Sequence, residues 1–395
     1  MANPVLQPDT AYRPARDGIR AAPARRALAI TLAAVAVWVF LFRVSGHMPD
    51  FEVYWRAGAR AADAEPIYRA EDGHYVFKYL PAFAVLAIPV GLLPQPVAQA
   101  VWFFTLVVLL VVFLRQAIRL LPERRKPVWL LVLVLIVVLG KFFGHEMVLG
   151  QVNLLLAVVA AGALLAIRSG REALAGALIV LAIVIKPYAV IFLPWLAARG
   201  RRQSLIAALL GFACVLALPA AVYGWTGNVT LHQEWWATVT STTAPNLFVV
   251  DNVSLAAAFA RILGAGDLAA RLAVAGSAAL LGLAGAVFML RRGLRFPEGL
   301  EGALLMTSTP LISPQGWDYV FLLSAPAIAC LANYEDRLPL ALRVATAVAV
   351  AAIGLSLFDV MGRAAHRAFM EASMITWLYL VVIGALVTLR ARKIA

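Results

Sequence analysis

The strongest constraint on this chain is a series of long, uninterrupted apolar segments. They are Ala27–Val44, Val97–Leu114, Val128–Phe143, Leu205–Val222, Leu268–Leu290 and Leu340–Phe358. Each approaches the length of about 20 residues that a helix needs to cross the hydrocarbon core of a membrane. A span must pair its backbone polar groups internally, and continuous rather than alternating apolar residues exclude barrel strands. The sequence therefore predicts an all-α polytopic membrane protein.

Three further apolar stretches are interrupted and predict broken helices or short spans. Leu80–Leu93 is short and ends next to Pro94, which is typical of a re-entrant or broken helix. Leu174–Ala198 holds Lys186-Pro187 at its middle, where proline breaks a helix, and predicts a hairpin of two half-helices. Glu298–Leu331 holds two short spans around a polar turn. The expected total is about ten spans plus two broken hairpins.

The charge balance points to the membrane. A formal net charge of +13 in a soluble protein would suggest nucleic acid, but 63% of the residues here are hydrophobic. Many of the arginines stand at the ends of apolar segments, as topology signals do. We therefore expect the membrane, and no nucleic acid, as a partner.

His145 and Glu146 are too few for a metal site, and no glycine-rich phosphate loop is present, so the sequence predicts no metal and no cofactor.

Loops rich in lysine and arginine are expected in the cytoplasm. These are Met1–Arg26, Arg115–Lys126, Arg168–Arg171, Arg199–Arg202, Arg291–Arg295, Glu335–Arg337 and Arg390–Lys393. The loops expected outside are Ser45–Lys78, Gly144–Gln151, Tyr223–Asp251, Ser313–Asp318 and Asp359–Ser373. The sequence thus predicts a basic cytoplasmic tail over 1–26 and a single helical transmembrane domain over 27–395. Two long outer loops, 45–78 and 223–263, would carry surface helices, one of them over Leu255–Leu263, and both termini would be cytoplasmic.

Asp50 is the first candidate for chemistry, because it follows the first helix and Pro49 at the outer membrane surface. A carboxylate in that place can act as a general base on an acceptor hydroxyl. It can equally be the N-cap of a surface helix. Glu52 and Asp63 are alternatives for the base.

Other candidates are polar groups close to apolar segments. Lys186 stands in the middle of an apolar hairpin, where a lysine is unfavourable unless it is functional or paired, and it could bind a lipid phosphate. Gln151 and Asn153 could donate hydrogen bonds to sugar or phosphate, or join helices. The turn that contains Trp317 and Asp318 could stack on a sugar ring, or be a plain interfacial loop.

Several motifs, in order, resemble glycosyltransferase family 87, which includes polyprenol-phosphate-mannose-dependent alpha-mannosyltransferases. The motifs are Asp50-Phe51-Glu52-Val53-Tyr54-Trp55, Ile67-Tyr68, Phe77-Lys78-Tyr79-Leu80-Pro81, Gly150-Gln151-Val152-Asn153, Lys186-Pro187 followed by Arg199–Arg202, Val253-Ser254-Leu255 and Ser313-Pro314-Gln315-Gly316-Trp317-Asp318. The resemblance runs from about Pro49 to Asp318, and the order of the motifs carries it.

The resemblance implies a GT-C fold in a bacterial inner membrane, with the active site on the periplasmic side. It implies a polyprenyl-phosphate sugar donor, a lipid or glycan acceptor, inversion, and Asp50 as the base. The substrate or donor contacts it suggests are Lys186, Gln151, Asn153, Tyr54, Trp55, Arg56, Tyr79, Trp317 and Asp318. The family often has histidine after the Trp-Asp pair, where this chain has Tyr319. We expect Asp50 and Lys186 to face each other across one cavity.

The main alternative is a transporter or flippase of lipid-linked sugars. It would share the many spans and the lysine inside the membrane, but it would not need an outer carboxylate. An oligosaccharide ligase or polymerase normally carries a very large outer loop, whereas the outer loops here are modest.

Overall fold

A computed structural model describes residues 17–290, 293–294 and 296–393, and every regular element in them is a helix. The sole β-type pairing in these described residues is a bridge between Asn252 and Trp317. The all-α prediction is therefore confirmed. The predicted tail lies outside the described residues up to position 16, as do residues 291, 292 and 295 of the predicted basic loop.

The chain divides into two units, 1–45 and 46–395. In the first, α1 (Asp17–Val39) continues into a π-helical turn over Phe40–Val44, so the predicted first helix is confirmed. Large apolar side chains along it are uncovered, and Ile30 is 70% exposed. Such a surface is expected to face lipid.

Among the described residues, four helices, all in the second unit, are long and apolar enough to cross a membrane. They are α5 (Gln95–Arg119), α6 (Val128–Leu149), α13 (Asp267–Leu290) and α19 (Met374–Ala391). Over all the described residues the number rises to six if two bent helix pairs, Ile30–Val44 with Pro49–Ala62 and Arg202–Ala217 with Ala220–Asn246, each count as one span. This is a multi-pass membrane protein. The expected total of about ten spans would have to include the shorter apolar helices.

The remaining helices are shorter or lie in loops. They are α2 (Pro49–Ala62), α3 (Pro81–Leu86), α4 (Ile88–Gly91), α7 (Asn153–Arg168), α8 (Glu172–Ile185), α9 (Phe192–Ala198), α10 (Arg202–Ala217), α11 (Ala220–Asn246), α12 (Leu255–Leu263), α14 (Pro297–Ile312), α15 (Ala325–Asn333), α16 (Leu340–Leu355), α17 (Phe358–Met361) and α18 (Arg363–Glu371). 3-10 turns cover Ala70–Tyr75, Pro187–Ile191, Asp318–Ser324 and Glu335–Arg337.

Both predicted helix breaks are present. Lys186 follows the end of α8 with extended backbone angles, and the chain continues through a 3-10 turn into α9. The segment Leu80–Leu93 contains α3 and α4, each with a proline in its first turn. Proline cannot donate to the preceding helical turn, so an apolar run that contains it is divided there.

The segment Leu205–Val222 differs from the single span expected for it. α10 ends at Ala217, α11 begins at Ala220, and the two are bent by 87°. Pro219 stands between them and cannot continue the hydrogen-bond ladder of α10. The predicted second outer loop is therefore largely helical, because α11 fills most of it. The helix predicted over Leu255–Leu263 is confirmed as α12.

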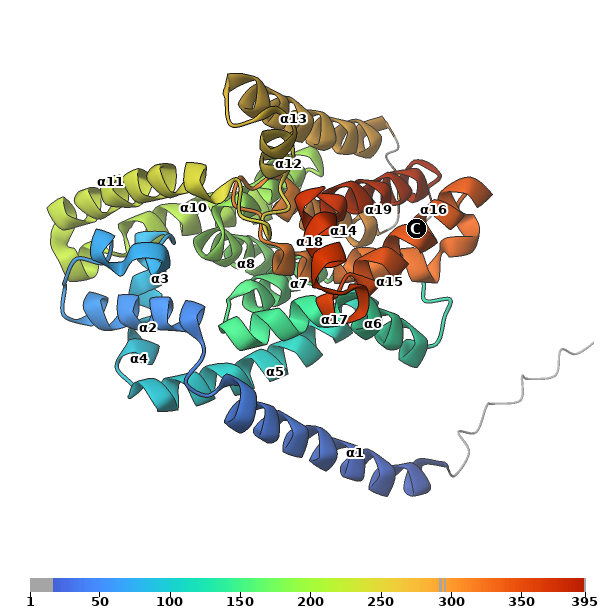
Figure 1. Ribbon diagram of the computed structural model, residues 1–395, viewed down its shortest axis with the longest axis horizontal. Coiled ribbons are helices and arrows are strands. Elements are labelled where there is room, and N and C mark those ends of the chain that lie inside the picture. The colour runs from blue at the N-terminus through green and yellow to red at the C-terminus, as the bar shows by residue number, and fades with distance from the viewer. Residues whose placement is uncertain (1–16, 291–292, 295, 394–395) are drawn as a thin grey trace, which may run out of the picture. The chain divides into compact units, whose positions relative to one another are not determined.

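The helix α7 lies between two groups of loops within the second unit, and it packs against α5, α8 and α14 (Figure 1). Near its start, the side chain of Gln151 contacts those of Asp50 and Tyr319; we call this the Asp50 end. At its other end, Arg168 donates to the carbonyl of Arg119 at 2.9 Å; we call this the Arg168 end. A helix of 16 residues separates the two ends by about 24 Å.

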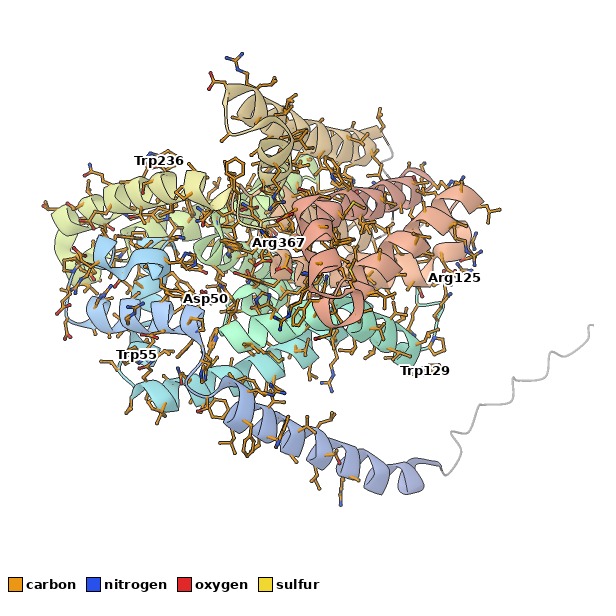
Figure 2. The ribbon with its side chains drawn as sticks, viewed as in Figure 1. Asp50, Trp55, Arg125, Trp129, Trp236 and Arg367 are labelled. Atoms are coloured by element: carbon orange, nitrogen blue, oxygen red, sulfur yellow. The ribbon has the colours of Figure 1, made fainter. Side chains whose placement is uncertain are left out.

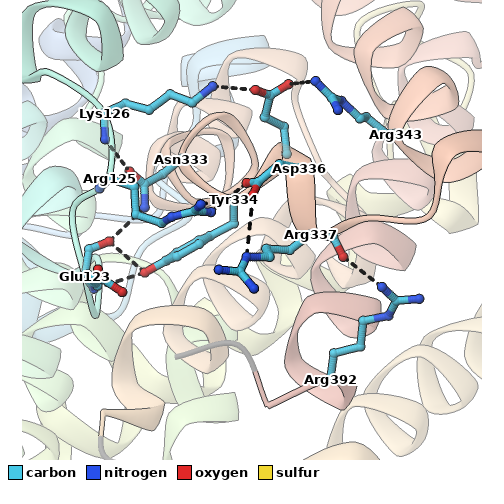
Figure 3. Close-up of polar contacts among 10 residues, drawn as sticks. Glu123, Arg125, Lys126, Asn333, Tyr334, Asp336, Arg337, Arg343 and Arg392 are labelled. Atoms are coloured by element: carbon cyan, nitrogen blue, oxygen red, sulfur yellow. Dashed lines mark hydrogen bonds and ion pairs between the residues drawn. The ribbon is translucent and has the colours of Figure 1, made fainter.

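Figure 3 shows loops at the Arg168 end that bind each other. The side-chain oxygen of Asn333 accepts hydrogen bonds from the backbone N–H groups of Arg125 and Lys126 at 2.8 and 3.1 Å. Arg125 also pairs with Asp336 at 2.6 Å. Three loops predicted to share the cytoplasmic side therefore lie together, because Arg392 also donates to the carbonyl of Arg337 at 2.9 Å.

Candidate active site

Asp50 lies in the first turn of α2, at the Asp50 end of the bundle, while Arg125 lies at the other end (Figure 2). Pro49 takes the first helical position, where its missing N–H group is not needed. The N-cap is Met48, so Asp50 is not the capping residue that its sequence position also allowed. A carboxylate in the first turn still interacts favourably with the helix dipole.

A glycine fixes where α2 meets the turn between α6 and α7. Gly150 ends α6 with a φ of 71°, in the left-handed region that favours glycine. A Cβ atom on Gly150 would lie 2.6 Å from Cβ of Phe51 and 2.7 Å from Cε of Met48. The two backbones can approach this closely only because the side chain is missing. The contact sets Asp50 beside the next residue of the turn, Gln151.

Gln151 joins three side chains from distant parts of the sequence. Its Nε2 donates to Oδ2 of Asp50 at 2.7 Å and to the hydroxyl of Tyr319 at 3.2 Å. Its Oε1 accepts from the hydroxyl of Tyr54 at 2.8 Å. Gln151 is only 6% exposed, so these bonds satisfy an amide that has little access to water. The predicted residues Asp50, Gln151 and Tyr54 are thus in direct contact.

The connection continues from Tyr54 to Lys186. The hydroxyls of Tyr54 and Tyr79 are 2.8 Å apart, and because Tyr54 donates its one hydrogen to Gln151, Tyr79 is the donor here. Burial raises the pKa of both phenols, which therefore stay neutral. The Nζ atom of Lys186 lies 5.6 Å from the centre of the Tyr79 ring, in the range of a cation–π interaction.

Lys186 is close enough to Asp50 and Glu146 for their charges to interact with its ammonium group. Its ammonium group forms no hydrogen bond and no ion pair with any described residue, and the side-chain contact it makes is with the Tyr79 ring. An ammonium group in that situation keeps its three donors available for an anionic ligand.

The environment of Asp50 alters its proton affinity. Burial raises the pKa of its carboxyl group. The hydrogen bond from Gln151 and the positive charges of Lys186 and His145 act in the opposite direction and offset part of the increase. A carboxylate with a raised pKa accepts a proton more readily, which suits a general base.

Asn153 lies behind Gln151 and is fully buried. Its Nδ2 donates to Glu146 at 2.8 Å, and the other oxygen of Glu146 accepts from the backbone N–H of Leu154, also at 2.8 Å. The carboxylate of Glu146 thus satisfies a free N–H group at the start of α7. This pair holds the turn that carries Gln151.

The predicted turn with Trp317 and Asp318 is connected to Gln151 through Tyr319, and Asp318 and Tyr319 both contact His145. Oδ1 of Asp318 accepts from the N–H of Tyr319 at 2.7 Å and lies 3.8 Å from Nδ1 of His145. The His145 ring is 5.0 Å from the Tyr319 ring. Sequence reasoning considered His145 only as a metal ligand. Its contact with a residue far along the chain has no local signal that could have revealed it.

Two predicted residues point elsewhere. Trp55 donates its Nε1 hydrogen to the carbonyl of Leu93 at 2.9 Å, and Arg56 pairs with Asp72 at 3.4 Å. On α2, Asp50 and Tyr54 are four positions apart and share the face toward Gln151. The next two positions turn away from that face, so Trp55 and Arg56 do not join the hydrogen-bonded set.

These features define a multi-pass helical membrane protein that carries a polar site with a carboxylate and an unpaired ammonium group at one end of its bundle. Residues 77–314, more than half of the chain, match the model of glycosyltransferase family 87. The chain therefore belongs to that family and is a membrane glycosyltransferase, which confirms the predicted resemblance. Comparisons with curated proteins and with solved structures find no match. The matched range includes Tyr79, Gln151, Asn153 and Lys186, but not Asp50.

Proposed function

We propose that the chain transfers a hexose, mannose, from a polyprenyl-phosphate donor to a lipid or glycan acceptor of the bacterial cell envelope, with inversion. Family membership supplies sugar transfer, with a donor and an acceptor. The donor and the mechanism are supported by the hydrogen-bonded set of Asp50, Gln151, Tyr54 and Tyr79. The ring of Tyr79, the last member of this set, is in contact with the ammonium group of Lys186. This set brings a buried carboxylate and a free ammonium group within electrostatic reach of each other.

In this mechanism Asp50 accepts the proton of the acceptor hydroxyl as its oxygen attacks the anomeric carbon. The bond between that carbon and the phosphate oxygen breaks, and the polyprenyl phosphate leaves with the electron pair. Lys186 stabilises the charge that develops on the leaving phosphate. Inversion requires attack opposite the leaving group, so the donor's anomeric carbon lies between Asp50 and Lys186, in a cavity that the two share.

The other side chains hold or surround this pair. Gln151 orients the Asp50 carboxylate, and Asn153 fixes the turn behind it. Trp317 and Asp318 border the sugar in this proposal, whereas the contacts of Trp55 with Leu93 and of Arg56 with Asp72 do not support the substrate-binding role expected for them. In this proposal the Asp50 end faces the periplasm and both termini are cytoplasmic, as the distribution of basic loops favours.

The sequence also allows a transporter or flippase of lipid-linked sugars. The family match favours transfer, because family 87 is a family of glycosyltransferases. The carboxylate beside Lys186 supports the same choice, since transport alone does not require a base.

The test compares Asp50→Asn with Asp63→Asn in membranes supplied with radiolabelled polyprenyl-phosphate mannose. We expect Asp50→Asn to lower transfer by about 10²- to 10⁴-fold, which is the contribution of a general base. Asp63, an exposed residue at the C-cap of the same helix, should be replaceable without loss. Equal transfer by wild type and Asp50→Asn would remove Asp50 as the base. Label transfer from a glucosyl but not a mannosyl donor would overturn the sugar alone.

A further inference from the structure

A second polar region lies at the Arg168 end, outside the site described above. α5, α7 and α8 lie side by side there and enclose a groove of about 840 Å³ (Figure 1). Its floor is the second half of α7, including Gly162, and its walls are the last turns of α5 and the first turns of α8. The length of α7 places it well apart from Gln151. The groove therefore does not belong to the transfer site.

Four arginines line this groove, and three of them are free. Arg115, Arg119 and Arg171 are exposed, and none has a side-chain hydrogen bond or ion pair within residues 17–290, 293–294 and 296–393. A nearby acid that could neutralise them, Glu172, is already bound to Arg201 at 3.1 Å. The guanidinium group is the side chain best shaped to bind the oxygens of a phosphate in pairs.

The fourth arginine shapes the groove. Arg168 donates to the carbonyls of Arg119 and Leu121 at 2.9 and 3.3 Å, and its guanidinium lies 4.2 Å from the ring centre of Phe296. These contacts tie the end of α7 to the end of α5. The mouth of the groove is thereby held in place without using the free arginines.

The rest of the lining is suited to a lipid rather than to a soluble anion. Leu174 and Leu178 form an apolar wall on α8, and Leu174 is 45% exposed. Gln116, on the opposite wall, has a buried side-chain oxygen with no hydrogen-bond partner among the described residues. An acceptor of that kind suits a hydroxyl donor on the ligand. Phosphate, hydroxyl and hydrocarbon together describe the headgroup and chain of an anionic phospholipid.

We propose that this groove is a binding site for an anionic phospholipid with a hydroxylated headgroup, such as phosphatidylglycerol. Arg115, Arg119 and Arg171 bind the phosphate, Gln116 accepts from the headgroup hydroxyl, and the acyl chains lie along Leu174 and Leu178. Basic pockets between membrane helices are known to bind such headgroups. The site would hold a lipid of the leaflet opposite to the transfer site, and it does not rest on the function proposed above.

The experiment places the purified full chain in nanodiscs of phosphatidylcholine with a small fraction of spin-labelled phosphatidylglycerol and measures how much label is immobilised. Arg115→Ala/Arg119→Ala should weaken this binding at least tenfold. The matched control Arg124→Ala/Arg202→Ala removes two exposed arginines that do not line the groove and should bind as wild type. Arg171→Ala tests the same site from outside α5 and should weaken binding even if the double variant fails to fold.

Three results would overturn the proposal. The first is equal binding of labelled phosphatidylglycerol by wild type and both groove variants. The second is that labelled phosphatidylcholine is retained as well as labelled phosphatidylglycerol. The third is complete displacement of the label by millimolar glycerol phosphate, which would mean that the groove takes a free phosphate compound. Sugar transfer is not part of the readout, so the outcome is separate from that of the Asp50 experiment.

Discussion

Asp50 and Lys186 are connected through neutral amide and phenol groups, whereas the charged side chains around Glu301, at the Arg168 end, bind each other directly. Glu301 shows the second arrangement. One of its oxygens accepts from Nε of Arg199 at 2.7 Å and Nε1 of Trp195 at 2.8 Å, and the other accepts from Nε of Arg390 at 2.8 Å. Both Glu301 and Arg390 are completely buried.

The difference separates charges that hold the fold from charges that can act on a ligand. A buried ion is tolerated only when partners satisfy it, and around Glu301 two arginines do so. Such a saturated carboxylate has no reason to bind a proton or a substrate. Asp50 has one side-chain hydrogen bond, from Gln151, and no ion pair with a described residue, so its carboxylate can still accept a proton. Burial alone therefore does not distinguish an acid that can act on a ligand from one that holds the fold. Incomplete pairing of the buried carboxylate does.

The largest effect should come from Glu301→Gln. Removing the charge leaves Arg390 buried without its counter-ion and should lower the free energy of unfolding by about 3–5 kcal/mol. Denaturant unfolding in detergent, followed by tryptophan fluorescence, measures it. Glu335→Gln is the control, because this partly exposed carboxylate pairs with Lys126 at the same end and should change stability by less than about 1 kcal/mol. If the two variants unfold alike, the Glu301 cluster does not hold the fold.

An intermediate effect is expected from Gly150→Ala. The new methyl group would meet Phe51 and Met48, and the left-handed backbone would be strained, so stability should fall by about 1–3 kcal/mol. Transfer should fall as well, because α2 and Gln151 move apart. Gly144→Ala, inside the helix that Gly150 caps and with open space around it, should be neutral or slightly stabilising. Equal effects of both alanines would show that the close contact with α2 is not needed.

The smallest effect should come from Gln151→Leu, and it appears in the pH dependence of transfer. The lost hydrogen bond favoured the charged carboxylate, so its removal raises the pKa of Asp50 further. A base works above its pKa, and the acidic limb of kcat/KM should therefore move to higher pH. At neutral pH the rate should fall only roughly fivefold, the equivalent of about one hydrogen bond. An acidic limb that stays in place would disconnect Gln151 from Asp50; Gln203→Leu, exposed on α10, serves as the control.

Local features of the sequence predicted the helices well, because apolar length and proline act over a few residues. The break at Lys186-Pro187 and the pieces α3 and α4 follow from proline alone. Pro219 carried the same signal, and the bend between α10 and α11 could have been predicted from it. The length of the apolar runs did not decide how many helices span, because several are shorter than a bilayer is thick.

The site was predictable only in part. Position after the first helix indicated Asp50, and the unusual place of a lysine indicated Lys186. The contacts among them depend on distant partners: Gln151 and Tyr319 are 168 positions apart, and no local pattern reports such a pair. Likewise, Trp55 shares a motif with Tyr54 but lies on another face of α2, where it donates a hydrogen bond to the carbonyl of Leu93. The face on which each residue lies depends on its position along the turns of the helix.

The lengths of the lipid-facing helices have a consequence for the membrane itself. α16 has 16 residues, about 24 Å, and its outer side chains Leu340, Val344 and Val348 are 76%, 54% and 62% exposed. The hydrocarbon layer of a bilayer is about 30 Å thick. Such hydrophobic mismatch is relieved when the surrounding acyl chains compress. If α16 crosses the membrane, we therefore expect the bilayer beside it to be thinner and short-chain lipids to gather there in preference to long-chain ones.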